Sequence, residues 1–192
     1  MGYWQDIQNF TPENRQEETD QAVMLHFMQA NPANILLREN RVAHITSSGF
    51  IVNPAGTKAL LAHHNIRGVW AWSGGHADGD QNLLQVAQKE AKEETGLAAV
   101  RPLFSQVASL DILPVEAPVR KGEYVNAHLH LSVAYLLVAD DALPLRPCPG
   151  ENTAVQWFAA EHFTTAHFSE RDVYLYNKLL RRAQAFLTSS PG

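Results

Sequence analysis

The sequence predicts an α/β fold in which helices cover both faces of a central mixed β-sheet. Short apolar segments with strand character alternate along the chain with three segments of helical character. The 192 residues are 45% hydrophobic and 18% charged, which suits one globular domain with a sizeable core. No repeat, low-complexity tract or linker divides the chain. We therefore expect residues 1–192 to form a single domain, with an N-terminal helical extension over about residues 1–40.

The first expected elements are a helix and a β-hairpin. A threonine cap and a proline in the first turn favour a helix that begins at Thr11–Pro12, and Asn31–Pro32 ends it. Residues 42–53 are rich in β-branched and apolar side chains, and residues 58–63 repeat this character after the turn Pro54–Gly56. Two such segments separated by a short turn predict a hairpin.

A short strand, a glycine loop and a helix follow. Residues 68–72 are an apolar segment that leads into a loop at Gly74–Gly75. Residues 81–94 have helical character, and Gly96 stands where a left-handed C-cap is expected.

The second half of the chain contains more strand than helix. Every second residue from Leu129 to Leu137 is apolar, which predicts a strand over residues 128–139 with one buried face. The other expected elements are extended segments at 100–113 and 154–158, loops at 114–122 and 144–150, and a C-terminal helix at 170–187.

Three carboxylates, Glu90, Glu93 and Glu94, lie in the last turns of the helix at 81–94, on the face that adjoins its apolar stripe. Spacings of three and four residues bring like charges together, and the helix dipole opposes each of them by about 0.3–1 kcal/mol. A divalent cation reverses this repulsion, since clustered carboxylate oxygens are suitable ligands for Mg²⁺. The cluster is therefore either a metal site or a solvated, glutamate-rich helix end.

The segment from Gly75 to Leu97 resembles the Nudix box, GX5EX7REUXEEXGU, in which U is an apolar residue. Six residues match the box in register, and they are Gly75, Glu90, Glu93, Glu94, Gly96 and Leu97. A motif of this length is a specific signal. The resemblance covers about residues 43–163, because the preceding hairpin and the segment 154–158 also resemble strands of that family.

This resemblance implies an α/β/α sandwich and a metal-dependent hydrolase. In the family, water attacks a phosphorus of a diphosphate linkage in a nucleoside diphosphate derivative. Carried over by position, Glu90 and Glu94 are metal ligands, and Glu93 is a ligand or an orienting base. The implied cofactor is Mg²⁺ or Mn²⁺.

The remaining positions of the box have structural roles, and two depart from the family's pattern. Gly75, Lys89 and Gly96 are the structural positions, and the carbonyl of Gly74 is a further candidate metal ligand. Gln81 stands where the box has its first glutamate, although two aspartates lie next to it. Lys89 replaces the box arginine and keeps its charge without the bidentate fork.

Outside the box, one acidic residue is a candidate for catalysis. Many members of the family add an acidic residue shortly before the strand that resembles residues 154–158, and Glu151 stands there. Glu151 is therefore a candidate fourth ligand or general base, with Glu123 as its competitor.

Four basic residues are candidates for substrate contact. His128 and His130 share the strand face opposite the leucines, and such a pair can ligate a metal. A third ligand is not evident in the sequence, so a substrate-binding or structural role is favoured. His76, in the glycine loop, and Arg67, shortly before it, are candidates for contact with an anionic substrate.

Composition bounds the partners and the compartment. A net charge of −5 argues against a dedicated nucleic-acid-binding protein, and no apolar run approaches the length of a membrane span. The N-terminus lacks the basic and apolar regions of a signal peptide, and the single cysteine, Cys148, does not suggest an oxidising compartment. We expect a cytoplasmic protein with a small-molecule partner. A homodimer is an expectation by analogy with the family.

Two alternative functions remain on the same fold. The departures at Gln81 and Lys89 allow a catalytically weak nucleotide-binding or sensor protein. Isopentenyl-diphosphate isomerase ranks last, because its chemistry requires a cysteine that acts with a glutamate, and Cys148 lies between prolines with no base partner visible in the sequence.

Overall fold

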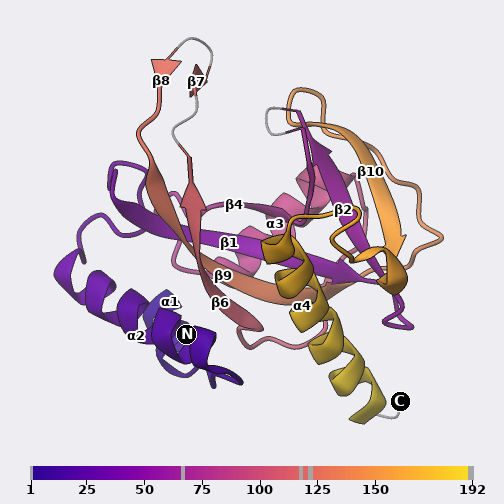
Figure 1. The fold of residues 1–192 in the computed structure, drawn as a ribbon, viewed down its shortest axis with the longest axis horizontal. Helices are drawn as coiled ribbons and strands as arrows, with labels where there is room; N and C mark the ends of the chain where they lie inside the picture. The colour runs from indigo at the N-terminus through magenta and orange to yellow at the C-terminus, as the bar shows by residue number, and fades with distance from the viewer. Residues whose placement is uncertain (1, 66–67, 117–118, 121–122, 190–192) are drawn as a thin grey trace.

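The fold is built around one mixed β-sheet (Figure 1). A computed structural model describes residues 2–65, 68–116, 119–120 and 123–189. Within these ranges the sheet has eight strands in the order β10-β2-β1-β9-β5, and β3, β4 and β6 pair with β2, β1 and β9 respectively. Its strands are β1 (Ala43–Val52), β2 (Lys58–His64), β3 (Trp70–Ala71), β4 (Ser73–His76), β5 (Arg101–Pro102), β6 (Ser109–Val115), β9 (His128–Val138) and β10 (Asn152–Ala159). A separate pair consists of β7 (Val119–Arg120) and β8 (Glu123–Tyr124). The helices are α1 (Tyr3–Gln8), α2 (Arg15–Ala30), α3 (Leu83–Thr95), the 3₁₀ turn η1 (Ala160–His162) and α4 (Glu170–Ser189).

β1 and β9 form the centre of the sheet and run parallel, while β2 pairs antiparallel with β1. Ile51 lies opposite Leu60 across the β1–β2 hairpin. The predicted hairpin and the mixed character of the sheet are therefore confirmed.

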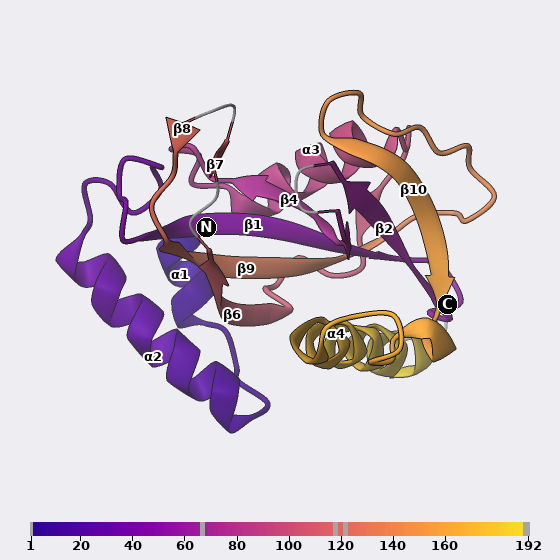
Figure 2. The same ribbon diagram turned by 45° about the horizontal axis from the view of Figure 1, so that its top comes forward.

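Helices lie on both faces of the sheet: α3 covers one side and α4 the other (Figure 2). Alternate residues of β1 and β9 point to opposite faces, so each helix has its own core. The core on the α3 side includes Ile45, Ile51, Leu131, Val133, Tyr135 and Leu137 from the sheet and Leu83, Ala87 and Ala91 from the helix. The core on the α4 side includes Phe50, Val52, Leu61, Leu136 and Val138 from the sheet and Leu175, Leu179, Leu180 and Ala183 from the helix. These two layers confirm the predicted α/β/α arrangement. In the described ranges, no helix has both the length and the apolar character needed to cross a bilayer.

The N-terminal helix differs from the prediction at its start. α2 begins at Arg15 because the side chain of Asn14 caps it, accepting a hydrogen bond from the backbone N–H of Glu17 at 3.0 Å. The segment at Thr11–Pro12 lies before the helix. α1, a six-residue helix whose buried side chain is Ile7, was not predicted from the sequence.

The prediction of a glycine loop at Gly74–Gly75 was wrong, because both residues belong to β4, which pairs antiparallel with β1. A Cβ atom on Gly74 would lie 2.6 Å from the hydroxyl oxygen of Ser48. A Cβ atom on Gly75 would lie 2.5 Å from the carboxyl carbon of Glu90 on α3. Glycine at 74 is therefore required for the close approach of β4 to the backbone of β1, whereas glycine at 75 leaves room for the carboxylate of Glu90.

The extended segment expected at 100–113 is divided into β5 and β6. The loop expected at 114–122 begins later than predicted, because β6 stays paired with β9 through Val115, which lies opposite His128. The partner strand thus holds residues 114 and 115 extended despite the proline at 114.

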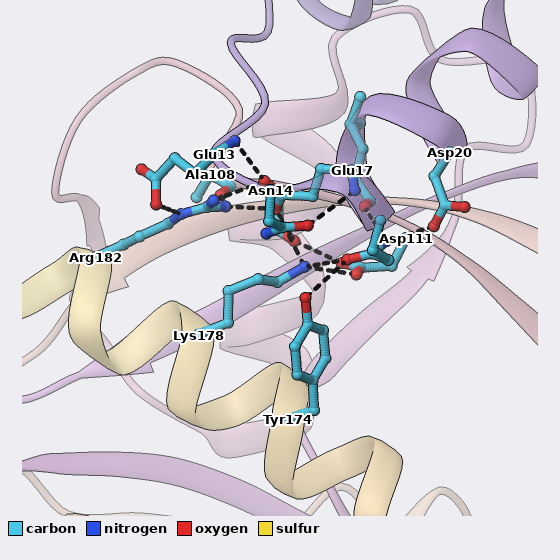
Figure 3. Close-up of polar contacts among 12 residues, drawn as sticks. Glu13, Asn14, Glu17, Asp20, Ala108, Asp111, Tyr174, Lys178 and Arg182 are labelled. Carbon is cyan, nitrogen blue, oxygen red and sulfur yellow. Dashed lines mark hydrogen bonds and ion pairs between the residues drawn. The ribbon is translucent and has the colours of Figure 1, made fainter.

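A buried ionic cluster joins the N-terminal extension to the C-terminal helix (Figure 3). Lys178 on α4 lies 2.7 Å from a carboxylate oxygen of Asp111 on β6 and 3.1 Å from one of Glu17 on α2. Arg182, one turn further along α4, binds both carboxylate oxygens of Glu17 at 2.6 and 2.7 Å. The side chains of Glu17, Asp111 and Lys178 are at most 4% exposed. Charges with little access to water therefore attach the N-terminal extension to the domain, together with the buried side chains of Ile7, Met24 and Met28.

Candidate functional site

The candidate site lies where the C-terminal half of α3 packs against β4. α3 begins after Asn82, whose side chain accepts a backbone hydrogen bond from the first turn, and ends at Gly96, whose φ of 70° is left-handed as predicted. These caps set the length of the helix, and its last two turns carry Glu90, Glu93 and Glu94.

Glu94 lies on the buried stripe of α3, and not on the adjoining face. Glu94 follows Leu83 by eleven residues, which is about three full helical turns. The two side chains therefore point in directions that differ by only about 20° around the helix axis. Ala87 and Ala91 lie on the same stripe, and Glu94 is only 6% exposed. Its Oε1 atom accepts a long hydrogen bond of 3.5 Å from the backbone N–H of Gly74.

The other two glutamates of the box have different environments. Glu90 is half-buried against the Cα atom of Gly75, in the space that a side chain there would occupy. Glu93 is exposed and forms an i,i+4 ion pair with Lys89, with 3.8 Å between Nζ and Oε2. Lys89 therefore binds one box glutamate by a single charged contact.

Burial and mutual repulsion weaken the acidity of the two inner glutamates. Burial is the main cause that raises the pKa of Glu94 to about 8. The hydrogen bond from the N–H of Gly74 lowers this pKa, and the charges of Glu90, Glu151 and Glu93 raise it. Burial also raises the pKa of Glu90, and the neighbouring carboxylate of Glu93 raises it further. Without a cation, the folded protein therefore resists ionisation of Glu94 near neutral pH.

This raised pKa predicts how the metal-free protein responds to pH. Above the usual glutamate pKa of 4.5 the unfolded chain releases the proton of Glu94, while the folded chain keeps it up to about pH 8. Stability due to this group is therefore lost as pH rises through that window, with a slope of up to about 1.4 kcal/mol per pH unit. We expect Glu94→Gln to gain stability relative to wild type as pH rises, measured by urea unfolding in EDTA from pH 5 to pH 8.5.

The matched control is Glu93→Gln, which removes the same charge from an exposed position. A gain that appears in both variants would come from net charge and not from burial. A difference between Glu94→Gln and wild type that stays constant with pH would mean that Glu94 is ionised throughout.

Glu151 lies close enough to this cluster to repel Glu90 and Glu94 electrostatically. The loop before β10 is held there by two contacts. The N–H of Asn65 donates to the carbonyl of Glu151 at 2.9 Å, and the side chain of Asn152 donates to the carbonyl of Glu94 at 2.9 Å. The fold thus brings four carboxylates from two distant segments together. The side chain of Glu123, the competing candidate, is not among those that the structure describes.

The donor set of this cluster fits a divalent cation such as Mg²⁺. Every candidate side-chain ligand is a carboxylate, and Mg²⁺ prefers oxygen ligands. A cation removes both the repulsion between the glutamates and the cost of ionising Glu94 in a buried position. Glu90 and Glu94 are the innermost of these side chains. The carbonyl of Gly74 remains a predicted ligand, with its N–H directed at Glu94.

The position of the missing box glutamate is not filled by the neighbouring aspartates. Gln81 is exposed just before α3. Asp78 receives two hydrogen bonds from Arg38, at 2.8 and 2.7 Å, and Asp80 accepts from the N–H of Asn82 at 2.8 Å. Both aspartates are thus engaged elsewhere.

The histidines lie on the other face of the sheet. His128 and His130 share one face of β9 as predicted, and their ring centroids are 5.1 Å apart. His76 on β4 and His44 on β1 join them, with ring centroids 5.0 Å apart. His44 was not among the site residues predicted from the sequence. The strand expected over residues 42–53 was its only signal, because the side chains beside His44 depend on the pairing of β1 with β9 and β4.

A cavity of about 420 Å³ opens beside these histidines. Its lining consists of Arg38, Arg41, His44, His76, Val115, Tyr124, Val125, Asn126, His128 and His130. Two arginines and four histidines make this cavity suitable for an anionic group. Arg67, predicted to contact substrate, lies outside the described residues, so its role stays a prediction.

Cys148 has an acidic neighbour that the sequence did not reveal. Burial and the nearby carboxylate of Glu151 raise the pKa of the thiol, and the two side chains are within hydrogen-bonding reach. The thiol is therefore held in its protonated form, which is the less nucleophilic one.

Comparisons with known proteins give a consistent result. A model of the NUDIX domain family matches residues 43–178. A NUDIX-family hydrolase from Clostridium perfringens is 21% identical, with a TM-score of 0.52 over 72% of this chain and 97% of that one. An Ap4A hydrolase from C. elegans, solved as a binary complex, is 20% identical, with a TM-score of 0.54 over 76% of this chain and 98% of that one. The Nudix hydrolase RenU from M. smegmatis is 17% identical, with a TM-score of 0.50 over 78% and 88% of the two chains. None of the curated proteins compared with the chain matches it significantly.

Proposed function

Because this chain belongs to the Nudix family, we propose that it is a metal-dependent hydrolase that cleaves a diphosphate linkage in a nucleoside diphosphate derivative. The observation that carries the proposal is the convergence of Glu90, Glu93, Glu94 and Glu151, in which the most buried carboxylate has no cationic side chain beside it among the described residues. Binding alone would not require such a costly cluster.

Each carboxylate has a proposed role. Glu90 and Glu94, with the carbonyl of Gly74, hold Mg²⁺ or Mn²⁺, which when bound neutralises charge on the phosphates and acidifies water. Glu93 or Glu151 accepts the proton from the attacking water. The oxygen of that water forms a bond to phosphorus, the bridging P–O bond breaks, and the second phosphate leaves with its electron pair.

The substrate class is also part of the proposal. The name of the C. elegans neighbour describes an enzyme that acts on Ap4A, so dinucleoside polyphosphates belong in the test panel with nucleoside sugars and other nucleoside diphosphate derivatives. The cavity beside Arg38 and Arg41 can receive an anionic part of such a substrate, and His76, His128 and His130 line it. A small-molecule substrate, a cytoplasmic location and a homodimer remain proposals.

The first test is hydrolysis of this panel with Mg²⁺ or Mn²⁺, run beside the Glu94→Gln protein and followed as the phosphate that added alkaline phosphatase releases from the phosphomonoester products. Metal-dependent release that the variant loses supports the hydrolase. Nucleotide binding without release across the panel favours the sensor alternative. Isomerase activity on isopentenyl diphosphate that Cys148→Ala abolishes would favour the third candidate, for which the contact between Cys148 and Glu151 is the supporting observation.

Substitution of Gly75 tests whether the position of the Glu90 carboxylate matters for catalysis without a large effect on protein stability. In Gly75→Ala the new methyl group would lie 2.5 Å from the carboxyl carbon of Glu90, which is the movable end of its side chain. We expect the carboxylate to move, so that kcat/KM falls roughly 10–100-fold. The free energy of unfolding should change by less than about 1 kcal/mol.

The control for this prediction is Gly2→Ala, where the nearest atom to a new Cβ is Oε1 of Gln81 at an ordinary 3.5 Å. That variant should keep full activity. Full activity in Gly75→Ala would show that the position of Glu90 does not matter for turnover.

A further inference from the structure

Three histidines from three neighbouring strands converge on the face of the sheet opposite α3. His44 on β1 is the direct partner of His130 on β9, and His76 on β4 pairs with Thr46, the next residue on the same face of β1. The ring centroid of His44 lies 5.0 Å from that of His76 and 5.2 Å from that of His130. The ring centroids of His76 and His130 are 5.0 Å apart. One ring nitrogen from each histidine lies within 4.8 Å of the other two. Ligand atoms of a tetrahedral zinc site are about 3.4 Å apart, so these nitrogens would have to approach one another by at most about 1.4 Å to share an ion.

The hydrogen bonding of His44 leaves its other nitrogen suited to a metal. Nδ1 of His44 lies 2.9 Å from the backbone carbonyl of Asn40, which only accepts hydrogen bonds, so Nδ1 carries the proton. Nε2 then has a lone pair. This atom is buried and has no hydrogen-bond partner in the part of the chain that the structure describes. A ligating histidine characteristically uses its second nitrogen in this way, to fix ring orientation and tautomer.

A fourth histidine borders the same group. His128 lies 5.0 Å from His44 between ring centroids, and its Nδ1 is 2.9 Å from the carbonyl of Asn126. Its Nε2 therefore has a lone pair as well, although His128 is not among the three histidines whose ligand atoms converge within 4.8 Å. Asp78, the nearby carboxylate, is engaged by Arg38. Imidazole nitrogen is thus the dominant donor type of the cluster.

We propose that His44, His76 and His130 bind a divalent first-row transition-metal ion, with Zn²⁺ as the best match, at a site separate from the carboxylate cluster. Imidazole suits zinc and its neighbours, whereas Mg²⁺ prefers oxygen. β4 separates the two sites, because Gly75 faces α3 while the next residue, His76, faces His44 and His130 on the other side of the sheet. Three protein ligands leave one position open, and the three histidines line the same cavity as Arg38 and Arg41. Water or an anionic oxygen can fill that position.

This proposal changes the interpretation of the pair His128 and His130. The sequence favoured a substrate-binding or structural role for want of a third ligand, and the fold provides His44 and His76 from two other strands. Contact with substrate by these histidines would then pass through the metal ion.

The test is Zn²⁺ titration of the full-length, metal-stripped protein against a chromophoric zinc chelator, with excess Mg²⁺ to occupy the carboxylates. We expect one Zn²⁺ per chain in wild type and in Glu94→Gln. His130→Gln and His76→Gln should each weaken binding by more than about 100-fold, since loss of an outer-shell partner alone costs 10–100-fold. The control is His162→Gln, which removes an exposed histidine that contacts His167 outside the cluster.

Two further measurements guard against a folding defect. The histidine variants should unfold at the wild-type temperature in EDTA, and Zn²⁺ should raise that temperature only in proteins with an intact cluster. The visible absorption of bound Co²⁺ should change in His130→Gln and stay unchanged in Glu94→Gln. Absence of zinc binding by wild type, binding that persists in both histidine variants, or binding lost in Glu94→Gln would each overturn the proposal. None of these readouts uses hydrolysis, so the result is independent of the proposed function.

Discussion

Glu94→Gln is expected to lower turnover by more than about 100-fold, because loss of a proposed direct metal ligand should cost more than loss of an outer-shell partner, which costs 10–100-fold. The substitution preserves the shape of a side chain that is 6% exposed and removes the charge that a cation requires. The fold should therefore stay intact. The measurement is kcat with the best substrate of the panel at saturating Mg²⁺, alongside the unfolding temperature.

Glu93→Gln distinguishes the two roles that remain open for Glu93. A ligand would lose metal affinity, and extra Mg²⁺ would restore part of the rate. A base would lose kcat at every Mg²⁺ concentration. The matched control is Glu161→Gln, an exposed glutamate in η1, which should keep wild-type turnover. Normal turnover in both Glu93→Gln and Glu94→Gln would refute the mechanism.

Lys178→Met is expected to lower the free energy of unfolding by about 3–5 kcal/mol, which is typical when one partner of a buried ion pair is removed. Methionine keeps most of the volume of lysine, but Asp111 loses the ammonium group 2.7 Å away and stays buried (Figure 3). Glu17 keeps its two hydrogen bonds from Arg182. The loss is therefore caused mainly by Asp111, and urea unfolding at pH 7 measures it.

Two control variants show whether the loss of stability in Lys178→Met comes from the burial of Asp111. Lys58→Met breaks an ion pair of the same length, 2.7 Å to Asp141, but with side chains that are 45% and 27% exposed. Its cost should stay below about 1 kcal/mol. The double variant Lys178→Met with Asp111→Leu should recover much of the lost stability, because an apolar pair replaces a buried charge pair at little cost. A small effect in Lys178→Met itself would mean that water reaches the cluster.

Features that depend on short-range spacing were predictable from the sequence. The glutamates of the box, the cap at Gly96 and the alternating strand at 128–139 all follow from the periods of a helix and a strand. The burial of Glu94 was also predictable, since its eleven-residue spacing from Leu83 places it on the core stripe, although the sequence-based prediction put it on the adjoining face. The start of α2 was less predictable, because Thr11 and Asn14 are both good caps and only one is used.

Features that depend on which segments meet were decided by the tertiary structure. The order β9-β1-β4 brings His44 and His76 to His130, and the loop before β10 brings Glu151 to the glutamates of α3. The contact of α4 with α2 through Lys178 and Glu17 spans almost the whole chain. Local spacing constrains the direction of each side chain on its own element. It carries no information about strand order, and strand order determines which side chains from distant segments share a site.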